Sequence, residues 1–517
     1  MTTSSLPGRP ESLWIASTPT TAFPPLPAGV HVDVAILGGG IAGITAAWLL
    51  KQAGLRVAIV EARRIAAGVT GNTTAKVTAL HNLIYRFLID HVGEGRARLY
   101  AHANQAGIEE IERISTVRGI DCGFTRASAF TFTERDEDAG DIEMEVEAAR
   151  RLGLPARLVQ ETGLPFPVKA AIELPGQAHF HPRRYLLGLA AEIPGDGSHV
   201  FEETPAIDVR DASPCVVDTA HGPLTADRVL LCTHQPFLLK GFYYARMHLK
   251  RSYALGVRLA GPIPAGMYIS AGAGFHSFRP ARDDSGDLLI VGGAGHRTGH
   301  EDDTAARVLE LEEYARTRFS VERIDYRWAT QDNVTLDRIP YVGLLSRGSK
   351  NVYVATGFGG WGMTNGTAAA MLLTDLVLGH ENPWEELYSP RRLDGTVAGR
   401  MLAQSAVQAV DFLGGHLHLP GSHDPADVAA GEARIIQRGW MKVAVYRDPA
   451  GEVHAVSPIC THLQCVVRWN SAETSWDCPC HGSRFDPDGR VLHGPAVKPL
   501  SAVDLRTGIP LDVEEGA

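Results

Sequence analysis

A glycine-rich stretch near the N-terminus constrains the fold more than any other part of the sequence. An apolar run at 34–37 predicts a buried parallel strand, and a helical pattern follows at 41–52. The spacing G-x-G-x-x-G between them allows a tight turn, close approach of the backbone to a pyrophosphate, and close helix packing. A second strand at 56–60 ends at an acid that can bind ribose hydroxyls. The pattern consists of Gly38, Gly40, Gly43 and Glu61, and it predicts a dinucleotide-binding βαβ unit rather than a glycine-rich turn of another α/β protein.

The length and charge of the chain set further limits. The chain has 517 residues, too many for one core, so two or three domains are expected. Its net charge is −10 and no basic stripe is visible, which argues against a nucleic-acid partner. Consecutive glycines interrupt the long apolar stretch 34–50, so we expect no membrane span.

The first 30 residues, rich in Pro, Ser and Thr, show no periodicity and no signal-peptide pattern. We expect residues 1–30 to form a leader that lies over the surface through Trp14 and Phe23. A cytoplasmic protein is the corresponding expectation.

Two later segments place small residues where a large planar ligand could approach the backbone. The first follows the second strand and contains Gly68, Thr70, Asn72 and Thr73; the alternative is a polar loop that only caps the next helix. The second is a strand, glycine turn and helix over 352–378, whose helix N-terminus suits a polarised or anionic group. Its turn contains Gly357, Gly359, Gly360, Gly362 and Met363.

A third glycine-rich segment, Gly293-Ala-Gly295, could be taken for a second dinucleotide site. Its third glycine is displaced, and no strand ending in an acid follows. We therefore expect no second nucleotide site there, although a flavin reductase that uses NAD(P)H would need one.

Four of the seven cysteines gather near the C-terminus, with histidines between them. Cys460-x-His462 and Cys478-x-x-His481 supply two thiolates and two imidazoles, the ligand set of a Rieske [2Fe–2S] centre. A structural zinc site is the alternative, but zinc fingers pair cysteine with cysteine and histidine with histidine. The remaining cysteines indicate isolated buried thiols: Cys122, Cys215 and Cys232.

Residues 30–400 resemble the D-amino-acid-oxidase superfamily of FAD-dependent oxidoreductases, which includes glycine and sarcosine oxidases. The resemblance implies an α/β Rossmann-like FAD-binding domain (about 31–80, 190–245 and 325–400) interwoven with an antiparallel-sheet α+β substrate domain (about 80–190 and 245–325). It implies that Gly38, Gly40, Gly43 and Glu61 hold the ADP half of FAD. It further implies that Gly68, Thr70, Asn72 and Thr73 lie near the pyrophosphate and flavin, and that Gly357, Gly359, Gly360, Gly362 and Met363 lie along the isoalloxazine. Members typically take a hydride from a carbon next to an amine nitrogen.

The sequence departs from this superfamily at two points. Asn72 stands about where some relatives attach FAD through a histidine, and no cysteine lies between 232 and 460, so non-covalent FAD is expected. Some amino-acid oxidases have a lysine in the last glycine turn, near the substrate carboxylate, whereas this turn offers Trp361 and Met363, which argues against an amino-acid substrate. Arg279 and Arg297 could bind a carboxylate instead, or could be structural.

Residues 426–512 resemble a Rieske domain of the cytochrome bc type, so a small all-β domain is expected at 426–517 after a linker at 401–425. The resemblance implies that Cys460 and Cys478 bind one iron and that His462 and His481 bind the other. It also implies that Cys465 and Cys480 form a disulfide. Ser483 matches a serine that donates a hydrogen bond toward the cluster, whereas Phe485 replaces a tyrosine, which predicts a lower reduction potential.

The combination suggests a relay from a small-molecule substrate, an amine or amino acid, through FAD and the cluster to an external acceptor. One alternative is a reductase component, in which an external donor reduces FAD and the cluster supplies a partner. Another is an oxygen-using oxidase with a structural or sensing Rieske module. No second histidine/carboxylate set typical of a Rieske oxygenase is visible, and the sequence identifies no catalytic base.

Overall fold

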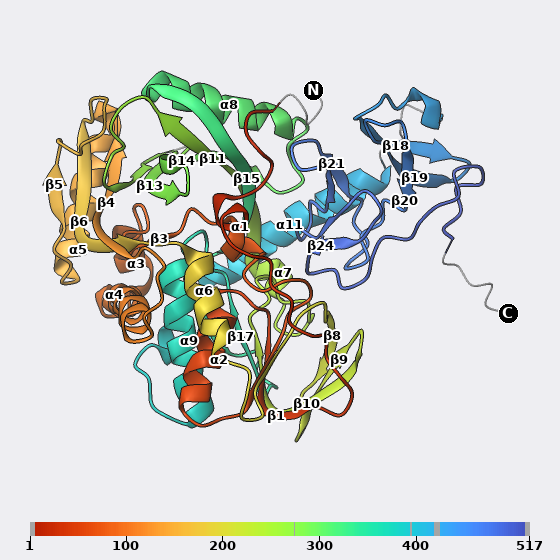
Figure 1. Cartoon of the computed structure of the whole chain (residues 1–517), viewed down its shortest axis with the longest axis horizontal. Coiled ribbons are helices and arrows are strands. Elements are labelled where there is room, and N and C mark those ends of the chain that lie inside the picture. Colours follow the sequence, from red (N-terminus) through yellow and green to blue (C-terminus); the bar gives the residue numbers. More distant parts are fainter. Residues whose placement is uncertain (1–5, 273, 393–394, 418–423, 512–517) are drawn as a thin grey trace.

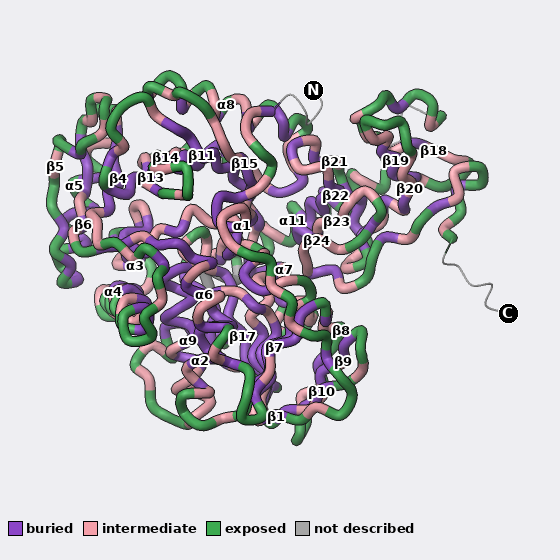
Figure 2. The backbone as a smooth tube through the Cα atoms, in the orientation of Figure 1, coloured by how far each residue is buried: buried purple, intermediate pink, exposed green. Residues whose placement is uncertain are grey.

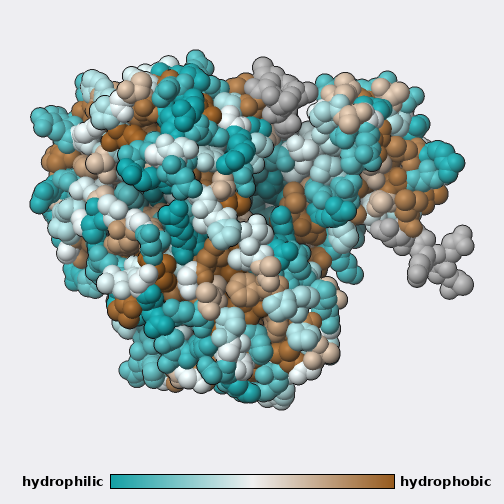
Figure 3. Space-filling model, in the orientation of Figure 1, coloured by the Kyte–Doolittle hydropathy of each residue, from teal (hydrophilic) through white to brown (hydrophobic). Residues whose placement is uncertain are grey.

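The computed structural model describes residues 6–272, 274–392, 395–417 and 424–511, with the side chains of 395–398 excepted. Figure 1 shows three bodies: a helix-covered sheet at the bottom, a second sheet with its helices at the upper left, and a small strand-rich domain at the right. The strands are largely buried, whereas the outer loops and helix surfaces are exposed (Figure 2). The face seen in Figure 3 is mostly hydrophilic, with scattered apolar residues.

The predicted βαβ unit lies at the centre of an eight-stranded sheet with the main order β16-β17-β10-β1-β2-β7. Strand β1 pairs in parallel with β2 and with β10, although some 200 residues separate β1 from β10. The strands are β1 (His31–Leu37), β2 (Val57–Val60), β7 (His199–Phe201), β8 (Ala206–Arg210), β9 (Cys215–Thr219), β10 (Gly222–Leu231), β16 (Tyr341–Leu344) and β17 (Val352–Thr356).

Two apolar helices, α2 and α9, pack on each other beside this sheet. Both are buried on most sides, and both begin directly after a strand and a glycine turn, as the sequence predicts. The helices of this part are α1 (Leu13–Ala16), α2 (Ile41–Gln52), α6 (Pro182–Ala191), α7 (Tyr243–Arg246), α9 (Gly362–Leu378) and α10 (Glu385–Tyr388), with a 3₁₀ turn η2 (Val69–Asn72).

The intervening segments build a nine-stranded sheet with the main order β15-β11-β14-β13-β12-β4-β6-β3, antiparallel except for β12 beside β4. Its strands are β3 (Lys76–Val77), β4 (Thr125–Thr133), β5 (Arg157–Val159), β6 (Ala170–His179), β11 (Met247–Leu259), β12 (Met267–Ser270), β13 (Ser277–Asp283), β14 (Gly286–Arg297) and β15 (Val321–Thr335). Its helices are α3 (Tyr85–Val92), α4 (Glu94–Val117), α5 (Ala139–Arg151) and α8 (Thr304–Arg318), with a 3₁₀ turn η3 (Asp136–Asp138). The chain therefore alternates between the two sheets, as the resemblance implies. Gly293 and Gly295 lie inside β14, not in a strand–turn–helix unit.

The C-terminal domain contains a three-stranded and a four-stranded antiparallel sheet. The elements are η4 (Pro425–Asp427), β18 (Ala433–Arg438), β19 (Met441–Arg447), β20 (Val453–Val456), β21 (Arg468–Asn470), β22 (Ser475–Asp477), β23 (Arg484–Phe485) and β24 (Val491–His493). No helix in the described part of the chain combines the length and apolar character needed to cross a membrane.

The structure adds detail to two expectations, those about the linker and the leader. Most of the expected linker 401–425 belongs to helix α11 (Gly395–Leu417), because good helix formers precede its glycines, while 418–423 lie outside the described residues. The leader packs through Trp14, as expected: this side chain, in α1, is almost fully buried, and its Nε1 donates to the Thr73 carbonyl at 2.7 Å. The leader thus supports the loop predicted to contact the planar ligand.

Candidate functional site

The three glycines of the fingerprint have different roles. A Cβ at Gly43 would lie 2.0 Å from the Gly38 carbonyl oxygen, and one at Gly38 would lie 2.4 Å from the Cys232 carbonyl oxygen. Both positions therefore need glycine so that strand, turn and helix can pack closely. At Gly40 a Cβ would meet only Thr70 Oγ1, at 3.2 Å, so this turn presents open backbone to a ligand.

A cavity of about 930 Å³ begins at this turn and extends between the two large sheets. The two later segments of small residues that the sequence predicts near a planar ligand also line this cavity. They are η2 with its flanks and the turn before α9. Among the predicted residues, Gly43 packs beneath the turn, and the following line the cavity: Gly38, Gly40, Glu61, Gly68, Thr70, Asn72, Thr73, Gly357, Gly359, Gly360, Gly362 and Met363. The structure therefore brings together residues more than 300 positions apart.

The cavity has the donors and acceptors that FAD requires. Neither N-cap residue of α2 and α9 caps its helix with a side chain, and of the first amides of α2 the Ile41 amide donates to Thr70 Oγ1 at 3.2 Å. The other N-terminal amides of the two helices can bind phosphate or a polarised carbonyl. Glu61 lies at the end of β2, where its carboxylate accepts from the backbone amides of Gly39 at 2.8 Å and Arg63 at 2.9 Å. Burial raises the pKa of Glu61, and the two amides oppose that shift. Each carboxylate oxygen keeps a second lone pair for a ribose hydroxyl.

Two side chains bear on the expectation of non-covalent FAD. The Asn72 amide donates to the carbonyls of Gly68 and Ala67, at 2.9 and 3.2 Å, so it holds the loop in shape. Cys232 lines the cavity beside Gly38 and is half-buried, not buried as predicted. Burial raises the pKa of its thiol to about 12, which disfavours the thiolate needed for a covalent bond.

On its other side the cavity meets the nine-stranded sheet. Lys250 and Ser252 of β11 and Thr330 and Asp332 of β15 line it there. Lys250 faces Asp332 across the two strands. Burial lowers the pKa of Lys250 and raises the pKa of Asp332 to about 6. These four residues were not predicted from the sequence. The alternation of side chains along strand 321–335 would have placed Thr330 and Asp332 on one face of the strand. It would not have shown that this face meets the cavity.

The two arginines considered for a substrate carboxylate are both structural. Arg279 is buried and donates to the carbonyls of Ala75 at 2.9 Å and Phe180 at 3.1 Å. Arg297 lies 3.7 Å from the Asp411 carboxylate of helix α11. Neither lines the cavity, so the prediction that either binds substrate is not supported.

In the C-terminal domain the predicted cluster ligands converge. The rings of His462 and His481 have centroids 5.0 Å apart, and both Nδ1 atoms are buried without a partner among the described residues. Cys460 and Cys478 are close enough for each thiol to shift the pKa of the other. A pair of neighbouring thiols and a pair of neighbouring imidazoles with unpartnered nitrogens fit a [2Fe–2S] cluster held by Cys₂His₂.

The residues around this ligand set also agree with the resemblance. Cys465 and Cys480 form a disulfide that joins the two ligand loops. The Ser483 hydroxyl lies beside Cys460 and helps to lower the pKa of its thiol, and it accepts from the Ala496 amide at 3.0 Å. Phe485 is fully buried in the same core as the four cysteines.

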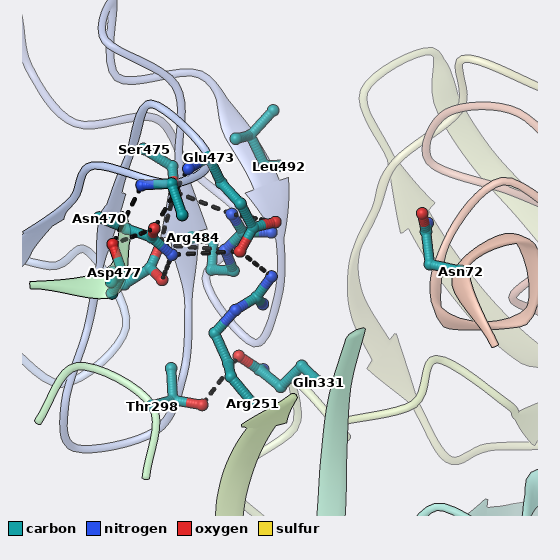
Figure 4. A network of polar contacts seen from close by, with 12 residues as sticks. Asn72, Arg251, Thr298, Gln331, Asn470, Glu473, Ser475, Asp477, Arg484 and Leu492 are labelled. Atoms are coloured by element: carbon teal, nitrogen blue, oxygen red, sulfur yellow. Dashed lines mark hydrogen bonds and ion pairs between the residues drawn. The ribbon is translucent and has the colours of Figure 1, made fainter. Parts of the chain in front are cut away.

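A buried ionic network joins the C-terminal domain to β11 (Figure 4). Arg251, only 1% exposed, extends from β11 to Glu473. Glu473 also pairs with Arg484 at 3.0 Å, and Arg484 pairs with Asp477 at 3.0 Å. The two arginines balance the two carboxylates. Because side chains alternate along a strand, Arg251 points to the C-terminal domain while its neighbour Lys250 lines the cavity.

A second connection runs through the loop 490–499, which includes the short strand β24 (Val491–His493). This loop lines the cavity, and His493 within it shares a hydrogen bond of 3.0 Å with His234, which follows β10. The same loop binds both ligand loops, because the Ala496 amide donates to Ser483 and the Thr461 hydroxyl donates to the Lys498 carbonyl. One short segment therefore lines the cavity and also contacts the two loops that contain the predicted cluster ligands.

Fold and site define a flavin-dependent oxidoreductase joined to a Rieske iron–sulfur domain. The family model described as FAD dependent oxidoreductase matches residues 33–376, and the model of the Rieske [2Fe-2S] domain matches residues 422–504. The chain belongs to the FAD dependent oxidoreductase family and contains a C-terminal Rieske domain.

Several known proteins share these features. YhfW of Bacillus subtilis, described as a Rieske 2Fe-2S iron–sulfur protein, is 38% identical over 499 residues, which cover 96% of this chain and 98% of that protein. Gamma-glutamylputrescine oxidoreductase of Escherichia coli is 26% identical over 373 residues, 69% of this chain and 86% of that protein. The structure of glycine oxidase from Geobacillus kaustophilus has a TM-score of 0.58 and 21% identity and covers 71% of this chain and 100% of that chain.

Proposed function

We propose that the protein dehydrogenates a carbon–nitrogen bond of an amine or amino acid and passes the electrons through the Rieske cluster to an external acceptor. Bound FAD would accept the hydride, and the cluster would carry one electron at a time. The chemical class is supported by the family and by the relatives named for γ-glutamylputrescine and glycine, both of which contain carbon–nitrogen bonds.

The main support for the proposed relay is the position of the loop 490–499. It forms part of the cavity wall and also contacts both ligand loops of the cluster. A Rieske domain that served only to bind another protein would not need to line the flavin cavity. The Arg251–Glu473 pair supports the same proposal, because it joins the flavoprotein to the Rieske domain.

An anaerobic rapid-mixing experiment tests this proposal. The purified holoprotein is mixed with a panel of amines and amino acids, with NADH and with NADPH, while flavin bleaching and the cluster spectrum are followed together. We expect an amine or amino acid to bleach the flavin first and the cluster to be reduced next. In a Cys478→Ser variant, which lacks one cluster ligand, the first phase should persist and the second should disappear.

The other outcomes separate the alternatives. If only a nicotinamide reduces the flavin, the reductase function replaces the amine dehydrogenase. A third outcome has three parts: an amine bleaches the flavin, the cluster stays oxidised, and oxygen restores the flavin even in Cys478→Ser. In that case the protein is an oxidase with a structural or sensing Rieske domain. The proposed cytoplasmic location is a separate prediction, which cell fractionation tests.

A further inference from the structure

The cavity wall formed by β11 and β15 holds two opposite charges that do not pair with each other. Lys250 and Asp332 are cross-strand partners and both line the cavity, yet they form no ion pair within 4.0 Å in the described structure. Lys250 is engaged elsewhere, since its Nζ lies 3.8 Å from the centre of the Phe275 ring. Asp332 accepts no hydrogen bond from any described residue, so its carboxylate has free acceptor positions toward the cavity.

Asp332 lies against the turn that precedes α9. A Cβ at Gly360 would lie 3.4 Å from Asp332 Oδ2, so this carboxylate is next to the turn's backbone. The neighbouring Asn333 carbonyl accepts from the Gly359 amide at 3.0 Å, which fixes strand and turn together. The resemblance implies that this turn lies along the isoalloxazine, so a group bound to Asp332 would be beside the reacting ring.

Two other acceptor atoms in the cavity wall also have no donor. Asn82 Oδ1 and Thr330 Oγ1 are buried and have no partner among the described residues. Thr330 is two residues from Asp332 on the same strand, so both side chains are on the same face. Buried acceptors without donors are costly, and a ligand that carries several N–H groups would satisfy them.

We propose that Asp332 binds the ammonium group of the substrate and accepts a proton from it. The N–H bond breaks, an O–H bond forms on the Asp332 carboxylate, and the nitrogen keeps the electron pair. The neutral amine can then give up a hydride from its neighbouring carbon, which an ammonium ion cannot do readily. This inference rests on the proposed function, and it specifies a substrate with a cationic nitrogen.

The surroundings of Asp332 set the expected pH dependence. Burial raises its pKa to about 6, while Lys250 and Arg251 of the facing strand oppose that rise. The turn 357–362 contributes no titratable side chain. The Asp332 carboxylate is therefore charged above about pH 6. When the pH falls through that value, the carboxylate is protonated and no longer attracts an ammonium ion.

A binding titration tests the proposal without turnover. Oxidised holoprotein is titrated anaerobically with propylammonium or with propionate, and the perturbation of the flavin spectrum gives the dissociation constants. We expect propylammonium to bind to the wild type and to bind about tenfold or more weakly to Asp332→Asn, because a charge-assisted hydrogen bond is lost. Asp332→Glu, which keeps the charge, should retain binding, and the wild-type affinity should fall as the pH is lowered through about 6.

Glu322→Gln is the matched control, because Glu322 is an exposed carboxylate on the same strand. The proposal is overturned if propylammonium does not bind to the wild type, if Asp332→Asn binds it equally well, or if Glu322→Gln shows the same loss. Failure of the proposed function looks different. In that case no amine bleaches the wild-type flavin, while propylammonium still binds in a manner that depends on Asp332.

Discussion

Replacing Arg251 with methionine tests whether the buried network holds the Rieske domain against the flavoprotein. Arg251 is the network's member from the flavoprotein, whereas Glu473, Asp477 and Arg484 belong to the Rieske domain (Figure 4). Methionine keeps a flexible apolar side chain of similar length but removes the charge. The Rieske part of the network then retains two carboxylates and one arginine, which leaves one negative charge without compensation.

The magnitude follows from burial. Removing one partner of a buried ion pair costs about 3–5 kcal/mol. Glu473 is 20% exposed, so water can recover part of that loss, and we expect about 2–3 kcal/mol. With an m-value of about 1–3 kcal/mol per molar urea, the urea midpoint of the Rieske domain should fall by roughly 0.7–3 M.

The assay is urea unfolding of the holoprotein, followed by the visible circular dichroism of the cluster. Arg282→Met is the matched control: Arg282 pairs with Asp287 on the same sheet, but the two side chains are 73% and 56% exposed. An exposed pair contributes about 0–1 kcal/mol, so the control should shift the midpoint little. An unchanged midpoint in Arg251→Met, or an equal shift in the control, would refute the reasoning.

Further predictions concern the two cofactor sites. Gly43→Ala places a Cβ 2.0 Å from the Gly38 carbonyl oxygen, so this variant should purify without flavin. The ratio of flavin to protein absorbance measures this loss. The control Gly95→Ala, where a Cβ would meet nothing within 4 Å, should retain the flavin. Ser483→Ala removes the hydroxyl beside Cys460, which by the resemblance donates toward the cluster, so redox titration should give a lower cluster potential. Phe485→Tyr adds a hydroxyl within the core that contains the cluster cysteines, and the same titration should give a higher potential; no rise would contradict the proposed role of the missing tyrosine.

Features that depend on spacing along the chain were predictable. The glycine fingerprint predicted helix α2 with its observed bounds, because turn, helix and strand are consecutive and each constrains the next. The cluster ligands and their disulfide could likewise be assigned by resemblance, since each ligand loop is short. These sites are built from local segments whose chemistry is evident from residue types.

Helix α11 shows where local reasoning was insufficient. Glycine, proline and histidine near 414–425 suggested a linker, yet the helix extends to Leu417. Its position is fixed by contacts with distant parts of the chain: Gln408 donates to the Tyr244 carbonyl at 2.7 Å, and Asp411 faces His300 at 3.2 Å. Packing of this kind can override a local preference for irregular structure.

The sequence by itself determined the two cofactor classes, and it predicted the ligands of the cluster and the segments that would approach the flavin. Tertiary structure alone decided which residues these segments meet. His234 and His493 are 259 positions apart, and Arg251 and Glu473 are 222 apart. The sequence also left open what the two faces of β11 and β15 contact. Alternation along a strand shows which side chains share a face, but not what that face meets. Sheet register and domain docking made one face the cavity wall, with Asp332, and turned Arg251 toward the Rieske domain.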